Sequence, residues 1–267
     1  MTTTTLFETP GPIERRRIRG WTLAGVVPAA ILVFLAVKVL SDADLFDSEN
    51  WSVLGRTDLQ LALLRGVGAT LKVAVFTVAL SLVFGLLLAL ARMSEAHWIS
   101  TPARIWIEAL RGLPELLLVF FIYLGVPAAT GFDISTFWAL VIGLVLYEST
   151  SMAEVFRGGF ASLPRGQSEA AEALGLRTVK TLRFVLLPQV IRQVLPSLVS
   201  EMVRVTKASS LGFVIGYTDL LLTGELAIEY LGGEYAAPVF AAVAALYVVI
   251  CLLLGRLSLL LSERLRK

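Results

Sequence analysis

Long apolar runs separated by short polar segments make up most of this 267-residue chain. Five runs are long enough to cross about 30 Å of hydrocarbon as a helix that rises about 1.5 Å per residue. They cover residues 21–40, 67–90, 105–126, 196–215 and 239–261. A shorter run over residues 137–153 adds a sixth. The pattern predicts an all-α, polytopic membrane protein with six transmembrane helices.

The composition supports this fold class. Hydrophobic residues make up 57% of the chain and charged residues only 16%, which is more apolar surface than a soluble domain of this size can bury. Four arginines precede the first run, at positions 15, 16, 17 and 19, and no small-residue cleavage site follows it. We therefore expect the first run to be a retained helix and not a signal peptide.

Lys and Arg are distributed unevenly among the polar segments. They concentrate in residues 1–20, 91–104, 154–195 and 262–267, whereas residues 41–64 hold one basic residue and residues 223–236 hold none. Because basic loops stay on the cytoplasmic side, both termini are predicted to be cytoplasmic. Residues 1–20 are expected to form a disordered tail, residues 41–64 an extracytoplasmic loop and residues 262–267 a short cytoplasmic tail.

Several kinds of chemistry are missing from the sequence. It contains no G-x-x-x-x-G-K-[ST] phosphate loop and no cysteine nucleophile beside a base. His97 is the only histidine and has no cluster of Cys, Asp or Glu around it, so no metal site is expected. The net charge of +2 reflects topology, and nothing indicates nucleic-acid binding. We expect no catalysis and no bound cofactor in this chain.

The basic loop between the fourth and fifth runs carries an unusual pattern. It reads E-A-A-E-A-L-G over residues 169–175, then nine residues, then V-L-L-P over residues 185–188. Ser168 is predicted to cap a short helix that ends at Gly175, and a second short helix is predicted to stop before Pro188. A solvated loop lying on the lipid surface is the alternative. The small alanine face favours docking into a groove on another protein.

Charges within the apolar runs are the second unusual feature. Glu115, Glu148, Arg204 and Lys207 lie in or near these runs, where an ionised group costs at least about 2.5–3.5 kcal/mol. Two explanations stay open for the first three residues, contact with a cargo or cavity, and internal ion pairing. Lys207 has the alternative of a structural role at the inner mouth.

Six motifs in order resemble those of ABC importer permeases of the polar amino acid uptake branch. One of them is the E-A-A…G loop. The others are L-R-G-L-P-E-L (110–116) with F-F-I-Y-L-G (120–125), E-V-F-R-G-G (154–159), P-R-G-Q (164–167), L-P-Q (187–189) and K-A-S-S-L (207–211). The resemblance covers about residues 64–261. It implies a five-helix type I importer core over residues 65–261, which includes the 154–195 loop with a cytoplasmic coupling helix. The helix over residues 21–40 is an addition to that core.

The resemblance implies partners and a location. The expected partners are a dimer of cytoplasmic ATPases that bind ATP and Mg²⁺, a second permease subunit and an extracytoplasmic amino acid binding protein. The second permease is a related chain or another copy, and related chains are favoured. The expected location is the prokaryotic inner membrane.

The resemblance also implies roles for individual residues. The residues expected to couple to the ATPase are Glu169, Ala170, Ala171, Ala173, Leu174 and Gly175. The residues expected along the substrate path are Glu115, Glu148, Arg204, Lys207, Ser209 and Ser210. The residues expected at a gate or helix break are Gly112, Pro114 and Gly212.

The cargo is less sharply indicated. The R-G-L-P-E run resembles permeases for basic amino acids and opines. The outer loop with Asp42 and Trp51, and L-G-F-V-I-G-Y over residues 211–217, resemble actinobacterial glutamate importers, although those relatives carry an amide where this chain has Glu148. We favour glutamate, with a basic amino acid or opine as the alternative cargo. A channel subunit or a regulatory membrane subunit is the alternative class.

Overall fold

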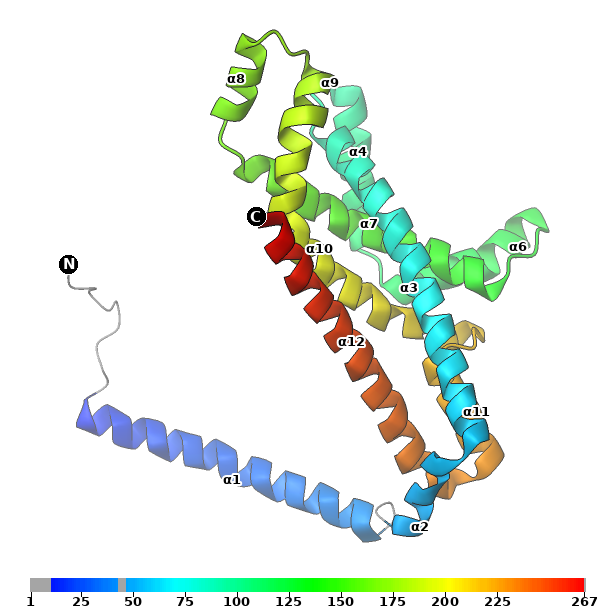
Figure 1. Cartoon of the computed structure of the whole chain (residues 1–267). Coiled ribbons are helices and arrows are strands. Elements are labelled where there is room, and N and C mark those ends of the chain that lie inside the picture. The colour runs from blue at the N-terminus through cyan, green and yellow to red at the C-terminus, as the bar shows by residue number, and fades with distance from the viewer. Residues whose placement is uncertain (1–10, 43–46, 267) are drawn as a thin grey trace.

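The computed structural model describes residues 11–42 and 47–266, and every element in this part of the chain is a helix (Figure 1). In chain order the elements are α1 (Pro12–Asp42), α2 (Ser48–Trp51), the 3₁₀-helix η1 (Ser52–Gly55), α3 (Thr57–Arg92), α4 (His97–Arg111), α5 (Glu115–Phe120), the π-helix η2 (Phe121–Gly125), α6 (Val126–Thr130), α7 (Thr136–Ser162), α8 (Gly166–Ala173), α9 (Thr178–Thr181), the π-helix η3 (Leu182–Leu186), α10 (Leu187–Ala208), the 3₁₀-helix η4 (Ser209–Ile215), α11 (Leu220–Leu231), the 3₁₀-helix η5 (Gly233–Tyr235) and α12 (Ala236–Arg266).

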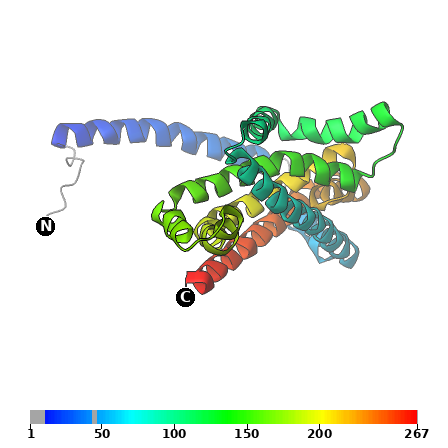
Figure 2. The same ribbon diagram turned by 90° about the horizontal axis from the view of Figure 1, so that it is seen from above.

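Four helical segments in the described part of the chain are long and apolar enough to cross a membrane, and a bent pair makes a fifth. The four segments are Thr57–Arg92, Thr136–Ser162, Thr178–Ile215 and Gly233–Arg256. They confirm the all-α membrane fold. The first expected span, residues 21–40, lies within α1, most of which extends away from the other helices in both views (Figures 1 and 2). The count of six spans therefore stays a prediction.

Three helices extend beyond the predicted boundaries of the membrane spans. α3 begins at Thr57, inside the expected 41–64 loop, and α12 continues to Arg266 through the expected 262–267 tail. α1 begins at Pro12, so part of the expected disordered tail is helical, while residues 1–10 lie outside the described part. Hydropathy marks where a chain can lie in lipid, but a helix continues until a breaker or a cap ends it. The sequence has neither Gly nor Pro at residues 64–65 and 261–262, and Gly20 alone does not end α1.

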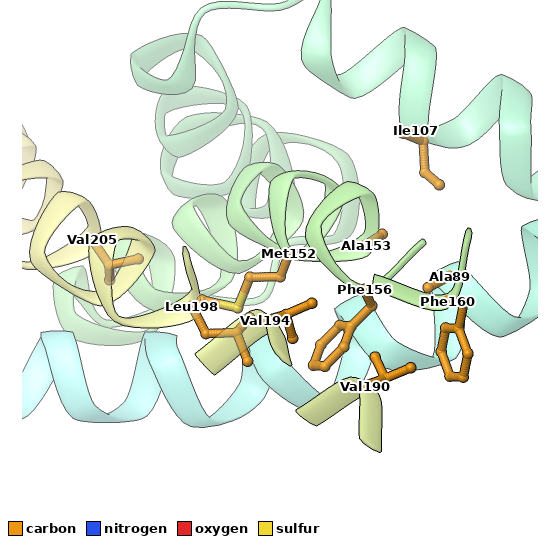
Figure 3. Packing of buried hydrophobic residues seen from close by; sticks show 10 residues of the cluster. All are labelled: Ala89, Ile107, Met152, Ala153, Phe156, Phe160, Val190, Val194, Leu198 and Val205. Carbon is orange, nitrogen blue, oxygen red and sulfur yellow. The ribbon is translucent and has the colours of Figure 1, made fainter. Parts of the chain in front are cut away.

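The centre of the molecule is built on close contact among α3, α7 and α10. Figure 3 shows one buried cluster, in which Met152 and Phe156 of α7 gather with Ala89 of α3 and with Val194 and Leu198 of α10. Small residues let α3 and α7 approach each other. A Cβ atom on Gly85 would lie 2.7 Å from Met152 Cβ. Such small-residue contacts drive helix association in lipid, where lipid tails are as apolar as the helices.

Gly85→Val is expected to weaken this packing. The added side chain has to push α3 and α7 apart, which costs typically about 1–3 kcal/mol. The measurement is the thermal unfolding midpoint of the purified protein in nanodiscs. Gly68→Val is the matched control on the same helix, because a Cβ there meets nothing within 4 Å. Equal midpoints for the two variants would contradict the close approach of these helices.

Candidate functional site

The predicted coupling loop contains a short helix, α8, which ends in a well-formed C-cap. Gly175 has φ +75°, the Leu176 amide donates to the Ala171 carbonyl (3.1 Å), and the Gly175 amide donates to the Glu172 carbonyl (2.8 Å). This is a Schellman motif, which requires the left-handed conformation that glycine adopts without strain. A Cβ at Gly175 would meet nothing within 4 Å, so conformation and not space requires glycine here. The prediction that Gly175 ends the helix is confirmed.

The start of α8 differs from the prediction. The helix begins at Gly166, two residues before Ser168, and Arg165 occupies the N-cap position without a side-chain hydrogen bond. Ser168 instead lies in the first turn, where its hydroxyl donates to the Arg165 carbonyl at 2.8 Å. The turn at Pro164 brings residues 165–167 into helical conformation, so Ser168 cannot be the cap.

The exposed face of α8 is smaller than expected. Leu174 is 82% exposed, and Glu169, Ala170 and Ala173 are also exposed. Ala171, however, is only 3% exposed. Because α8 packs against α9 and η3, one of its faces is covered by its own chain. The structure therefore removes Ala171 from the expected docking face.

The chain continues from the loop into the membrane as one helical segment, Thr178–Ile215. The prediction that a separate short helix stops before Pro188 is wrong. The π-helix η3 precedes Pro188, which lies in the first turn of α10. Proline lacks an amide donor and is tolerated in a first turn. The Gln189 side chain donates to the Val185 carbonyl at 2.7 Å, which adds a hydrogen bond at this irregular turn.

Three of the four charges expected within the membrane lie together in one cluster, whereas the fourth, Lys207, lines a groove. Arg204 of α10 lies at the centre of a cluster with three carboxylates, from Glu115 at the start of α5, Glu148 of α7 and Glu201 of α10. Its Nη1 donates to Glu115 Oε1 and Glu148 Oε1, each at 3.0 Å, and its Nε donates to Glu201 Oε2 at 2.8 Å. Nη2 also bonds Glu148 Oε2. Of the two explanations left open, the structure has internal ion pairing.

Burial explains why these groups pair. The Glu148 side chain is fully buried, while Glu115 and Glu201 are about one-fifth exposed, at 21% and 22%. Arg204 is 37% exposed. A buried carboxylate without a partner is very costly, and a guanidinium can serve several carboxylates because it has five donors in a planar fork. One residue of α10 thereby holds α5 and α7 together.

The two expected helix breaks differ in kind. Gly112 and Pro114 separate α4 from α5, and the chain turns by 103° there, so residues 105–126 are not one straight span. At Ser209 the helix does not break but tightens to the 3₁₀-helix η4. Gly212 packs against α7, because a Cβ there would lie 2.6 Å from Leu140 Cδ2. A gating role for these residues stays a prediction.

The two serines of the expected path are already engaged within the chain. Ser209 is fully buried and donates to the Thr206 carbonyl, and Ser210 donates to the Lys207 carbonyl, each at 2.8 Å. Hydroxyls of this kind in helices often bond the preceding turn. Burial removes Ser209 from the expected path surface in this conformation, while Ser210 lines a groove together with Lys207.

Sequence reasoning missed two buried or half-buried acidic residues, Glu201 and Asp219. Glu201 could have been found from its i,i+3 spacing to Arg204. Asp219 is fully buried, caps α11 by accepting from the Leu222 amide, and accepts a hydrogen bond from the Tyr247 hydroxyl at 3.1 Å. Its signal was an acidic residue directly before the apolar start of a helix.

A second ion-pair network joins the C-terminal ends of α3 and α4 to α7. Glu154 of α7 bonds Arg92 at the end of α3 and Arg157 of its own helix, and it lies 4.0 Å from Arg111 of α4. Arg92 and Arg111 lie too far from Glu154 in the sequence for their spacing to predict these contacts. Within the part of the chain that the structure describes, no group of three His, Cys, Asp or Glu residues could hold a metal ion.

Comparisons with known proteins agree with this architecture. The family model "Binding-protein-dependent transport system inner membrane component" matches residues 81–267. The octopine transport system permease OccM of Rhizobium radiobacter is 36% identical over 211 residues, which cover 76% of this chain and 85% of the relative. The glutamate transport system permease GluD of Corynebacterium glutamicum is 36% identical over 235 residues, which cover 85% and 84% of the two chains.

A solved structure supports the same assignment. A chain from the crystal structure of an amino acid ABC transporter with histidines is 32% identical and superposes with a TM-score of 0.71 over 79% of this chain and 97% of its own. The family match covers more than half of the chain, and both relatives exceed 30% identity. The chain therefore belongs to the inner membrane components of binding-protein-dependent transport systems and is the permease subunit of an amino acid ABC importer, in which a separate chain hydrolyses ATP.

Proposed function

We propose that this chain forms half of the translocation path and that α8 is the coupling helix through which ATPase closure moves α10. The exposed residues Glu169, Ala170, Ala173 and Leu174 and the C-cap glycine, Gly175, form the docking surface. ATP and Mg²⁺ bind to the partner ATPases. A second permease, a related chain or another copy, completes the path, and an extracytoplasmic binding protein delivers the cargo.

Side-chain hydrogen bonds that join α10 to α8 and to α7 support this proposal. Gln189 of α10 donates through Nε2 to Gln167 Oε1 of α8 at 3.2 Å, and Gln193 of α10 donates to the Ser162 hydroxyl of α7 at 2.8 Å. A coupling element has to transmit displacement without absorbing it, because a ligand moves an equilibrium only through contacts that differ between two states. Force on α8 therefore passes along α10 to Arg204.

The arrangement of the ends supports a cytoplasmic location for α8. Figure 1 shows α8 and the end of α12 in the upper half of the view, and α2 and α11 in the lower half. The loop of α8 is rich in Lys and Arg, whereas residues 223–236 hold three Glu and no basic residue. We propose that both termini are cytoplasmic.

The Arg204 cluster favours a cargo with a cationic group, such as a basic amino acid or an opine. Three carboxylates share one guanidinium, so acidic groups exceed basic groups by two. Because Arg204 already serves three carboxylates, it has little capacity left for an acidic cargo. This observation reverses our preference for glutamate. Glutamate stays the second candidate because GluD is 36% identical over 85% of this chain.

Uptake by the reconstituted importer decides between the candidates. The complex of permease, ATPase and binding protein in proteoliposomes is expected to accumulate labelled L-arginine or octopine saturably and only with ATP inside the vesicles. A control with non-hydrolysable ATP should show no accumulation. Saturable uptake of L-glutamate but not of arginine or octopine would overturn the cargo proposal, and uptake without ATP would favour a channel.

A further inference from the structure

A small polar pocket lies where α3 ends and α4 begins. Its volume is about 240 Å³, and its lining comprises Arg92, His97, Ser100, Thr101 and Arg104. Arg92 ends α3, and the other four residues follow one another on α4 at a spacing that places them on one face of a helix. Two arginines, one histidine and two hydroxyl groups therefore meet around one space, and no carboxylate is among the described residues that line it.

The basic groups of this pocket are only partly neutralised by their own chain. Arg104 donates through Nε to Glu108 Oε1 at 2.8 Å, which leaves both of its Nη groups without a partner among the described residues. In the ion-pair network around the pocket, two carboxylates, Glu108 and Glu154, serve four arginines at positions 92, 104, 111 and 157. Basic groups thus exceed acidic groups by two. A guanidinium with unused donors in its planar fork suits a phosphate group.

An apolar groove of about 340 Å³ lies next to this pocket, deeper along α3. Its lining comprises Leu80, Phe84 and Leu88 of α3, Trp106 of α4 and four residues of α7. The three α3 residues precede Arg92 by four, eight and twelve positions, so they lie along one side of the helix, about 6–18 Å from Arg92. Ser149 is the one polar residue among those that line the groove, and its hydroxyl already bonds a carbonyl of the preceding turn. The groove therefore suits an apolar chain.

We propose that the pocket and the groove together bind an anionic phospholipid, with its phosphate in the pocket and an acyl chain in the groove. The surplus of basic groups favours a lipid with net negative charge over a zwitterionic one. Trp98, next to His97, is 78% exposed, and tryptophan is enriched at the level of lipid headgroups. Arg92 pairs with Glu154 of α7, the helix that leads into the loop of α8. With α8 on the cytoplasmic side, as proposed above, the site faces the inner leaflet.

The preference for a headgroup tests the polar pocket. The purified permease–ATPase complex in detergent is titrated with phosphatidylglycerol and with phosphatidylcholine of the same acyl chains, and native mass spectrometry counts the bound lipids. The wild-type complex should bind phosphatidylglycerol at least about fivefold more tightly, which is the contribution of one basic residue near an anionic lipid. Arg104→Gln should remove most of this preference. Arg192→Gln is the matched control, because Arg192 is exposed on α10 and does not line the pocket.

A substitution with the opposite expected sign separates lipid binding from misfolding. Glu108→Gln removes the carboxylate that accepts from Arg104, so it should increase the preference for phosphatidylglycerol. A damaged fold would weaken binding instead. Reduced preference in both Glu108→Gln and Arg104→Gln would therefore show that their ion pair has only a structural role, and it would overturn the inference.

A second pair of variants tests the groove. Phe84→Ala removes a side chain of the groove and should weaken the binding of phosphatidylglycerol. Leu87→Ala should leave it unchanged, because Leu87 is exposed on the same helix but does not line the groove. The soluble sn-glycerol 3-phosphate, which has the phosphate but no acyl chain, should not displace the lipid at equal concentration.

Four further results would overturn the inference. They are equal affinity of the wild-type complex for the two lipids, an unchanged preference in Arg104→Gln, equal binding by Phe84→Ala and Leu87→Ala, and displacement of the lipid by sn-glycerol 3-phosphate, which would identify a site for free phosphate esters. Loss of the ATPase or of the second permease from the Arg104→Gln complex would assign the pocket to a protein contact instead. Lipid binding is measured without transport, so its failure would leave the coupling and cargo proposals unchanged.

Discussion

Arg204→Met is expected to abolish uptake and to destabilise the permease. The substitution leaves Glu148 fully buried without its cation, together with two further carboxylates nearby. Removal of one partner from a buried ion pair costs typically about 3–5 kcal/mol. The connection from α10 to α5 and α7 is lost at the same time. ATP-dependent uptake in proteoliposomes and the unfolding midpoint in nanodiscs measure the two effects.

A second substitution separates stability from transport. Arg204→Met combined with Glu148→Gln removes the stranded buried charge and should recover most of the stability, because an amide of similar shape replaces the carboxylate. Uptake should stay absent, since α10 no longer holds α5. Arg204→Lys should give intermediate stability, because an ammonium cannot match the planar fork. Normal uptake by Arg204→Met would contradict the proposed role of the cluster.

The positions of the functional residues could be predicted where local chemistry determines the backbone. Gly175 ends α8 because a Schellman motif needs a left-handed residue, and Gly112 with Pro114 bends the chain because proline cannot continue a helix. The free-energy cost of an ionised side chain in the membrane was the signal that identified Glu115, Glu148 and Arg204. Glu115 and Glu148 lie 89 and 56 positions before Arg204 in the sequence, and the three residues meet in one cluster.

The remaining errors come from tertiary contacts that have no local signal. Pro188 predicted a helix end, but a π-helix immediately before it lets the chain continue into α10. Ala171 looked equivalent to Ala170, yet only Ala171 is covered by the packing of α8 on its own chain. The choice between cargo contact and ion pairing also depended on which helices are neighbours, which the order of apolar runs does not specify.

The mechanical role of α8 makes its C-cap a sensitive position. Gly175 is exposed and lies outside the candidate spans, so its replacement should not affect insertion or the packing of the core. A β-branched residue at φ +75° is strained by about 1–2 kcal/mol, which the chain relieves by unwinding the end of α8. The exposed residues next to it, Ala173 and Leu174, would then lose their fixed positions.

Gly175→Val is therefore expected to abolish uptake and the stimulation of ATPase activity by binding protein and cargo, with normal amounts of permease in the membrane. Glu169→Lys, which reverses the charge on the exposed first turn of α8, should have the same effect. Gly175→Asn is the matched control and should retain most uptake, because asparagine tolerates the left-handed conformation. Co-purification of the ATPase with each variant distinguishes weakened docking from a docked but uncoupled complex. Wild-type uptake by both Gly175→Val and Glu169→Lys would exclude α8 as the coupling helix, whereas equal loss in Gly175→Asn would show that the glycine itself, and not its conformation, is needed in the ATPase groove.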